Sequence, residues 1–202
     1  MLKSRIANIA TSLIPGMHFT MTGTAGNAGG KPAFYLTFDD GPHPESTPRL
    51  LELLARHDAR ATFFCLGQNV DKYPAIYDSI LAAGHSTGNH TWSHPNGWTT
   101  STRRYMEDVD RAAEVINSKL FRPPYGRLTP GQYRQLKKKY NIIMWTRMFA
   151  DYHPRFNPTT TNLQDIRPGD ILVMHDKPDT VSRTLDLTQR ILSSSPYKKT
   201  SI

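Results

Sequence analysis

Cysteine and long apolar runs are what this 202-residue chain lacks most clearly. Its single cysteine, Cys65, excludes an internal disulfide. The apolar stretch around it, residues 61–66, predicts a core strand in which a lone thiol is a small apolar filler and not a nucleophile. No apolar run approaches the roughly 20 residues that a membrane-spanning helix needs, so we expect no membrane span.

Acidic residues are also in the minority. The chain has 17 Asp and Glu residues against 25 Lys and Arg residues, which leaves a net charge of +8. The basic residues are dispersed, however, and the one tight run, at 137–139, is typical of the solvated face of a helix. We find no recognition motif and no basic groove interleaved with aromatic residues, and we therefore expect no nucleic-acid partner.

The first thirty residues differ in character from the rest. Lys3 and Arg5 precede an apolar run at 6–14 that weakly resembles a signal peptide, but polar residues interrupt it and no small-residue cleavage site follows at once. We predict a lead-in segment over 1–30 and a single domain over 31–202. Localisation in the cytoplasm or at the cell envelope stays undecided.

Strand-like and helix-like segments alternate after residue 31. We predict strands at 33–38, 61–66, 120–122, 141–146 and 171–175, and helices at about 47–57, 71–83, 101–118, 130–139 and 180–193. Repeated β/α alternation predicts an α/β fold with a mainly parallel sheet, open or closed into a barrel.

Two pairs of polar residues stand out against this framework. Asp39 and Asp40 follow the first apolar strand, and a Gly-Pro pair then ends it, so both carboxylates are expected at the carboxyl edge of the sheet. His90 and His94 are four residues apart, and one helical turn would point both imidazoles the same way. Each residue alone has a simpler interpretation, as a turn or capping carboxylate or as a hydrogen-bonded histidine. Together, two imidazoles and a carboxylate indicate a three-ligand zinc site with a position left open, as in a catalyst.

Four short motifs occur in a fixed order along the chain. They are Thr-Phe-Asp-Asp-Gly-Pro at 37–42, His-Thr-Trp-Ser-His at 90–94, Arg-Pro-Pro-Tyr-Gly at 122–126 and Gly-Asp-Ile-Leu-Val-Met-His-Asp at 169–176. Through them the chain resembles the polysaccharide deacetylases, carbohydrate esterase family 4, which share the nodulation-protein-B homology domain. The resemblance spans about 33–177. It implies an irregular (β/α) barrel, TIM-like and seven-stranded, with 31–202 as the catalytic domain.

The resemblance implies roles for the residues around the metal. Asp40, His90 and His94 would bind it, and zinc suits this mixed set of nitrogen and oxygen ligands, although cobalt or nickel can substitute. Asp39 would be the general base for the attacking water. Arg122 would orient Asp39 through a bidentate contact.

Further residues gain roles from the same resemblance. The backbone N–H of Tyr125 would stabilise the oxyanion of the tetrahedral intermediate, and its ring can stack on a sugar. His175 would protonate the departing amine. Val173, on the same strand face, would line the slot for the acetyl methyl group. Trp92 is either a sugar platform or a shield for the metal-binding loop.

The fourth motif of the family is altered here. The family pattern is an aspartate, two spacers and Asp-Trp; Met148, Asp151 and Tyr152 stand at the three defined positions. Asp151 would orient and charge the acid histidine, His175, or its arginine neighbour. Since the changes touch the groove wall, where Tyr152 would meet the substrate, we expect catalysis to be retained with an altered substrate.

The sequence therefore predicts a metal-dependent hydrolase that removes N-acetyl groups from the amino sugars of a glycan, such as peptidoglycan or a chitin-like oligosaccharide, and releases acetate. Its partner would be that N-acetylated glycan; the oligomeric state is left open. One alternative is a deformylase or amidase of a lipid-linked sugar or small amide on the same fold. Another is a carbohydrate-binding protein that has lost catalysis, although binding alone needs neither Asp39 nor His175. The most distant is a basic nucleic-acid-binding module, whose binding would be strongly salt-dependent and indifferent to Asp40.

Overall fold

The computed structural model describes residues 15–21, 32–194 and 197–202. The signal-like run at 6–14 and the glycine-rich stretch at 23–30 lie outside these ranges. No helix in the described residues combines the length and the apolar character needed to cross a membrane.

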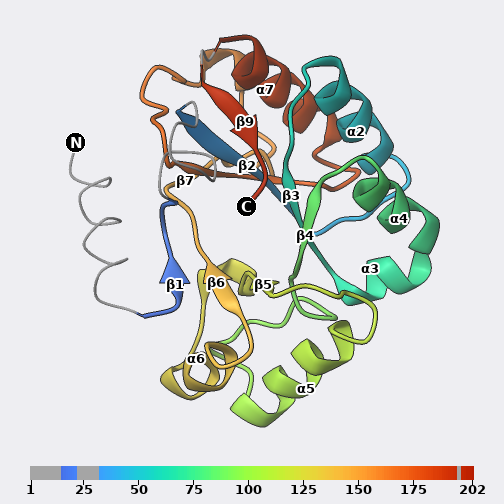
Figure 1. Cartoon of the computed structure of the whole chain (residues 1–202), viewed down its shortest axis with the longest axis vertical. Helices are drawn as coiled ribbons and strands as arrows, with labels where there is room; N and C mark the ends of the chain where they lie inside the picture. The colour runs from blue at the N-terminus through green and yellow to red at the C-terminus, as the bar shows by residue number, and fades with distance from the viewer. Residues whose placement is uncertain (1–14, 22–31, 195–196) are drawn as a thin grey trace.

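A parallel sheet forms the centre of the domain (Figure 1). Its strands are β1 (Met17–His18), β2 (Ala33–Asp39), β3 (Thr62–Cys65), β4 (Ser86–Asn89), β5 (Leu120–Phe121), β6 (Asn141–Ile143), β7 (Arg147–Met148), β8 (Ile171–His175) and β9 (Lys198–Thr200). The order across the sheet is β1-β6-β5-β4-β3-β2-β8-β7, with β9 also paired to β2. All of these pairings are parallel, so the carboxyl ends of the strands share one edge.

Helices lie around the outside of this sheet. They are α2 (Thr47–Arg56), α3 (Gly67–Lys72), α4 (Pro74–Ala82), α5 (Thr102–Ala112), α6 (Pro130–Leu136) and α7 (Val181–Ser194), joined by the short 3₁₀ turns η1 (Pro124–Gly126) and η2 (Pro158–Thr160). In Figure 1 they form an arc from α7 and α2 through α4 and α3 to α5 and α6.

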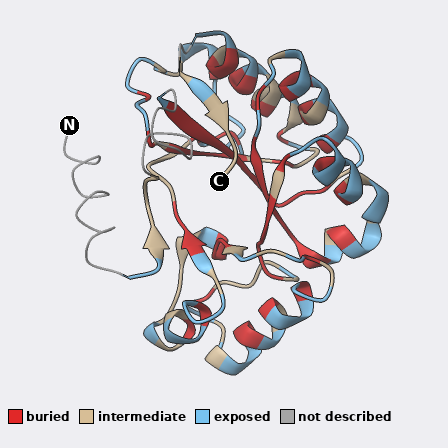
Figure 2. Cartoon of the chain, in the orientation of Figure 1, coloured by how far each residue is buried: buried red, intermediate tan, exposed pale blue. Residues whose placement is uncertain are grey.

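The central strand β2 explains why the site is held rigidly. Every residue of β2 is buried, as Figure 2 shows for the centre of the sheet. Its even-numbered side chains, among them Leu36 and Phe38, join the core cluster that includes Leu50 and Leu54 of α2. The alternate residues, ending with Asp39, face the other side of the sheet. Truncating a core leucine such as Leu54 to alanine would cost about 2–5 kcal/mol, because the packed core cannot collapse around the void.

The expected irregular barrel is confirmed, with differences in its elements. The sheet has nine strands where seven were expected, because the short strands β1 and β7 add to its two edges and β9 pairs with the central strand β2. The helix expected over 71–83 is two helices, α3 and α4, since Pro74 lacks an N–H and begins a new helix. The helix expected over 101–118 ends at Ala112.

Part of the predicted lead-in belongs to the sheet. β1 lies beside β6, with Met17 in register with Ile142. The Met21 N–H donates to the carbonyl of Gly169 across 3.0 Å, and the side chains of Met17 and Phe19 pack against a buried cluster. The described residues 15–21 therefore contribute an edge strand to the domain.

Candidate active site

A pocket of about 360 Å³ opens at the carboxyl edge of the sheet. Its position follows from the topology, because β2 ends at Asp39, β8 ends at His175, and His90 comes directly after β4. Twelve residues line it: Asp39, Asp40, His90, His94, Pro123, Tyr125, Arg127, Trp145, Met148, Tyr152, His175 and Lys177. The four sequence motifs thus meet in one cavity.

Asp40, His90 and His94 form a compact group of ligand atoms within 4.8 Å of one another. Nε2 of His90 lies 3.6 Å from Oδ1 of Asp40, and Nε2 of His94 lies 3.2 Å from the same oxygen. That oxygen is buried and has no hydrogen-bond partner among the described residues. An orphaned buried carboxylate oxygen facing two imidazole nitrogens is what a divalent metal ion would satisfy.

The ionisation of these residues also fits a metal. Burial lowers the pKa of His94 to about 4, with a further contribution from His90, so the His94 ring is neutral at pH 7. Burial alone would raise the pKa of Asp40, but the neighbouring His90, Lys177 and His94 outweigh it and bring that pKa to about 2. Nδ1 of His90 lies 2.7 Å from the carbonyl oxygen of Arg122. An Nδ1–H donated to that carbonyl leaves Nε2 free as a ligand, which is the usual support of a metal-binding histidine.

The expectation that His90 and His94 share a helical turn is wrong. They lie in a non-helical loop after β4, in which Thr91 has a φ of 70° and His94 a φ of 63°. Left-handed backbone is unusual for such residues and needs support from its surroundings. Oδ1 of Asp108, on α5, accepts hydrogen bonds from the backbone N–H groups of Trp92 (2.7 Å) and Ser93 (3.0 Å), while Oδ2 accepts from the Ser93 hydroxyl (2.6 Å). This carboxylate fastens the loop that carries His90 and His94 to α5.

Asp39 is held by the fully buried Arg122, but not through the expected bidentate contact. One terminal nitrogen of Arg122 donates to Oδ1 of Asp39 across 2.7 Å and to the Thr37 hydroxyl across 2.7 Å. Its other nitrogens donate to the carbonyls of Ile143 and Met144, each across 3.1 Å. Because the backbone takes these donors, only one corner of the guanidinium reaches the carboxylate.

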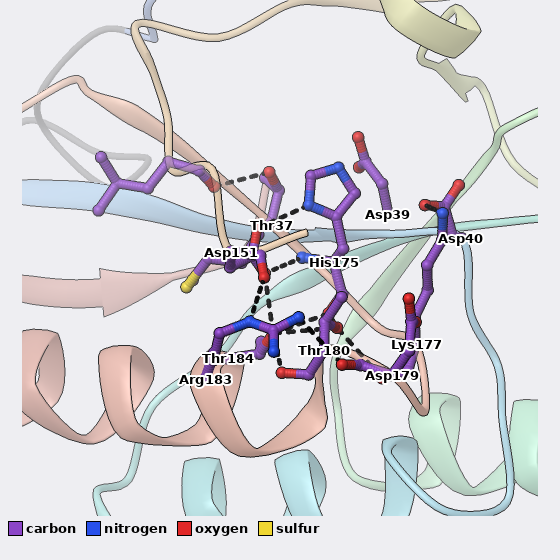
Figure 3. A network of polar contacts seen from close by, with 12 residues as sticks. Thr37, Asp39, Asp40, Asp151, His175, Lys177, Asp179, Thr180, Arg183 and Thr184 are labelled. Carbon is purple, nitrogen blue, oxygen red and sulfur yellow. Dashed lines mark hydrogen bonds and ion pairs between the residues drawn. The ribbon is translucent and has the colours of Figure 1, made fainter. Parts of the chain in front are cut away.

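His175 has its own carboxylate partner (Figure 3). Oδ1 of Asp151 lies 2.7 Å from Nδ1 of His175, and Oδ2 accepts from the His175 backbone N–H across 2.8 Å. Thr184 of α7 donates to the same Oδ2 across 2.8 Å. Burial alone would lower the pKa of His175, but the hydrogen bond and charge of Asp151 outweigh it and raise that pKa. The imidazole is thereby biased toward its protonated, proton-donating form.

The expected substrate contacts divide into two groups. Tyr125 and Tyr152 line the pocket and are exposed, and Tyr152 stands edge-on to the His175 ring at 5.1 Å. Val173 is fully buried and does not line the pocket. Trp92 does not line it either, because its ring packs over the Arg111 guanidinium at 3.8 Å and against the hydrophobic core. The structure therefore favours Trp92 as a shield for the loop over Trp92 as a sugar platform.

Residues that the sequence reading missed complete the site. Nζ of Lys177 pairs with Oδ2 of Asp40 across 2.8 Å, and Nδ2 of Asn69 donates to the Asp40 carbonyl across 2.7 Å. The fully buried carboxylate of Asp176 accepts from Ser46 (2.5 Å) and Thr47 (2.6 Å). Asp176 is the last residue of the motif at 169–176 and Lys177 follows it, so their place in the sequence was the available signal for these two. Asn69 carried none.

Comparisons with known proteins place the chain among known families. The polysaccharide deacetylase family model matches residues 26–145. A peptidoglycan-N-acetylglucosamine deacetylase of Bacillus cereus is 36% identical over 152 residues, covering 71% of this chain and 55% of that relative. A chitooligosaccharide deacetylase of Azorhizobium caulinodans is 34% identical over 155 residues, covering 71% of this chain and 73% of that relative. This chain thus spans about half the length of the first of these relatives.

A solved structure extends the likeness to the whole fold. The crystal structure of a peptidoglycan N-acetylglucosamine deacetylase in complex with 4-naphthalen-1-yl-N-oxidanyl-benzamide superimposes with a TM-score of 0.83 at 28% identity. The match covers 93% of this chain and 91% of that one.

Proposed function

We propose that this chain, which belongs to the polysaccharide deacetylase family, is a zinc-dependent hydrolase that releases acetate from N-acetylated amino sugars of a glycan. One observation supports this most. A carboxylate and an imidazole, Asp39 and His175, end adjacent strands and line the same pocket as a three-ligand metal site.

Asp40, His90 and His94 would hold the metal ion, for which zinc suits two imidazoles and a carboxylate. When bound there, the ion would supply a Lewis acid that polarises the acetamide carbonyl and favours ionisation of the attacking water.

Asp39 would take the proton of that water. Its carboxylate is almost fully buried, and the Arg122 contact to Oδ1 fixes its orientation. A base held in place loses little freedom in the transition state, which is the advantage of positioning it in advance. General-base catalysis of this kind typically contributes about 10²–10⁴-fold.

His175 would donate a proton to the departing amine. An amine is a poor leaving group until it is protonated, so the raised pKa of His175 serves this step directly. Asp151 fixes which ring nitrogen faces the pocket, because Nδ1 is engaged by the carboxylate. Nε2 is then the nitrogen left for the substrate.

Tyr125 would supply the oxyanion donor through its backbone N–H. The residue lines the pocket beside Pro123 and has a φ of 58°, a left-handed conformation. Such strain in a non-glycine residue costs about 1–3 kcal/mol and is concentrated at functional sites.

The substrate class follows from the pocket rim and from the relatives. Tyr125 and Tyr152 expose 57% and 48% of their surface on the rim, and aromatic faces suit the apolar faces of sugar rings. The relatives named above are deacetylases of peptidoglycan N-acetylglucosamine and of chitooligosaccharides. We therefore propose an N-acetylated glycan as the substrate, and not a small metabolite.

A product screen with zinc-loaded protein tests this function. We expect acetate from N-acetylglucosamine oligomers, no acetate after chelation of the metal, and recovery when zinc is restored. Formate from a lipid-linked formamido sugar, or a ring-opened amino acid from a small cyclic amide, with no acetate from any glycan, would replace the proposal with the related deformylase or amidase activity.

A further inference from the structure

Exposed aromatic side chains gather around the pocket. Within the described residues, four large hydrophobic side chains are exposed: Leu81, Trp98, Tyr125 and Tyr152. Tyr125 and Tyr152 line the pocket, and Trp98, exposed by 65%, stacks on a third lining residue, Arg127. Exposed aromatics confined to one site indicate a binding surface.

Arg127 is electrostatically unlike the other cations of the site. Arg122 pairs with Asp39 at 2.7 Å, and Lys177 pairs with Asp40 at 2.8 Å. The Arg127 guanidinium makes no ion pair in the part of the chain that the structure describes. Within the described residues, this guanidinium lies over the ring faces of Trp98, at 4.7 Å, and Tyr125, at 5.8 Å. It is a half-buried charge without a counter-charge, flanked by two rings.

The loops that carry these groups are fastened together. The buried Gln132 donates to the carbonyls of Gly97 (2.9 Å) and Thr100 (3.0 Å), on either side of Trp98. Gly97 also packs so closely against the carbonyl oxygen of Arg127 that a Cβ atom there would clash with it. The Trp98 ring is therefore presented in a fixed place beside the guanidinium, although the ring itself is solvent-exposed.

We propose that Arg127, Trp98 and Tyr125 form a sugar subsite that recognises a carboxylate on the glycan. This inference rests on the proposed function and narrows its substrate to an acidic N-acetylated glycan. The rings offer faces for the sugar, and the guanidinium pairs with an acid group on that sugar or the next one. A planar guanidinium binds a carboxylate through two parallel hydrogen bonds, and stacking on aromatic rings leaves its N–H edges free for this.

A second arginine in the chain provides a matched control. Arg111 stacks on Trp92 at 3.8 Å, as Arg127 does on Trp98, but Arg111 does not line the pocket. Replacing either arginine by glutamine removes one positive charge and one contact between a guanidinium and a tryptophan ring. Only the Arg127 variant removes the charge at the site.

The experiment compares two tetrasaccharides that differ in their acid groups. One is chitotetraose; the other alternates N-acetylglucosamine with N-acetylmuramic acid, which carries a lactyl carboxylate. Dissociation constants are measured by calorimetry with zinc-loaded protein in the Asp39→Asn background, which prevents turnover, and acetate release is measured with Asp39 intact. We expect the protein to bind the acidic glycan more tightly than chitotetraose. In Arg127→Gln, the ratio of the two dissociation constants should fall by about tenfold or more. Arg111→Gln should keep the preference, and Arg127→Lys should recover part of it.

Equal binding of the two glycans by the otherwise unchanged protein would overturn the subsite. A preference that survives Arg127→Gln, or that Arg111→Gln removes equally, would overturn it as well. If any of these results came together with acetate release from chitotetraose, the proposed deacetylase activity would stand and only the subsite would be refuted. If the protein preferred the acidic glycan through Arg127 but released acetate from neither glycan, the subsite would stand and the proposed deacetylase activity would be refuted.

Discussion

Asp39 and His175 are register partners on the adjacent parallel strands β2 and β8. Register partners on neighbouring strands lie about 4.8 Å apart along the sheet, with side chains on the same face. Each of the two contacts a charged side chain, Arg122 for Asp39 and Asp151 for His175, at 2.7 Å in both cases. A carboxylate and an imidazole, the proposed proton acceptor and proton donor, are thus fixed side by side at one edge of the sheet.

Asp151→Asn should change the pH dependence of turnover. Removing the negative charge destabilises the protonated ring of His175, so the pKa that Asp151 now raises would fall. The alkaline limb of the kcat profile should move to lower pH by about one to three units. Initial rates of acetate release between pH 5 and 10 measure this. The control is Asp165→Asn, at a carboxylate that is 64% exposed and lies outside the pocket. If the alkaline limb of the kcat profile did not move in Asp151→Asn, His175 would not be the general acid.

Zinc should stabilise the protein through His94. A ligand at a hundred times its dissociation constant adds about 2.7 kcal/mol to the free energy of unfolding. For a chain of this size that corresponds to a rise in Tm of about 5–10 °C. His94→Asn should abolish most of the rise, whereas His153→Asn, at an exposed histidine outside the pocket, should retain it. Differential scanning calorimetry with and without zinc measures both, and equal losses in the two variants would place the metal elsewhere.

Arg122→Lys should lower both stability and turnover. Lysine keeps the charge, but it cannot reach all four oxygens that Arg122 now satisfies, on Asp39, Thr37, Ile143 and Met144. Each buried acceptor left without a donor costs about 1–3 kcal/mol. Urea unfolding and kcat measure the two effects, with the exposed Arg104→Lys as the control. Full turnover in Arg122→Lys would mean that Asp39 needs no such support.

Asp176→Asn should alter how stability depends on pH. Burial raises the pKa of Asp176 to about 6, whereas an aspartate in an unfolded chain titrates near 3.9. Between about pH 4 and 6 the native state therefore binds more protons than the unfolded state, and this group's contribution to the free energy of unfolding falls as the pH rises. The asparagine variant lacks that loss, so it should gain stability relative to the natural chain across this window.

Urea unfolding at pH 4, 5, 6 and 7 checks the Asp176 prediction. The matched control is Asp58→Asn, whose carboxylate is fully exposed and should show no such change relative to the natural chain. A constant stability difference between Asp176→Asn and the natural chain across the four pH values would contradict the raised pKa.

The sequence predicts β2 and its neighbours well because burial on both faces leaves a continuous apolar run, as in residues 33–38. β4 escaped prediction because its residues, Ser-Thr-Gly-Asn, carry no apolar pattern. Its Gly88 is required by contact: a Cβ atom there would meet the Phe64 ring at 2.5 Å. Two-residue edge strands such as β1 are set by pairing partners far away in the chain, which no local pattern encodes.

The site shows the same division between local and distant causes. The four motifs place Asp40, His90 and His94 correctly in one pocket, but spacing alone suggested a helix where the structure has a loop. That loop depends on Asp108, which lies on a separate helix and stabilises the left-handed backbone around Thr91. The partners of Arg122 likewise could not be predicted from the sequence, since two of the four are backbone carbonyls at the end of β6.

Acetate release by zinc-loaded Asp39→Asn, beside the natural chain, tests the central claim most directly. Asparagine keeps the shape of the side chain but cannot accept the proton of the attacking water, and it leaves Asp40, His90 and His94 unchanged. The account predicts acetate from N-acetylglucosamine oligomers with the natural chain, a loss of at least about a hundredfold in kcat with the variant, and the same zinc content in both. Equal rates of acetate release from two equally loaded proteins would contradict it.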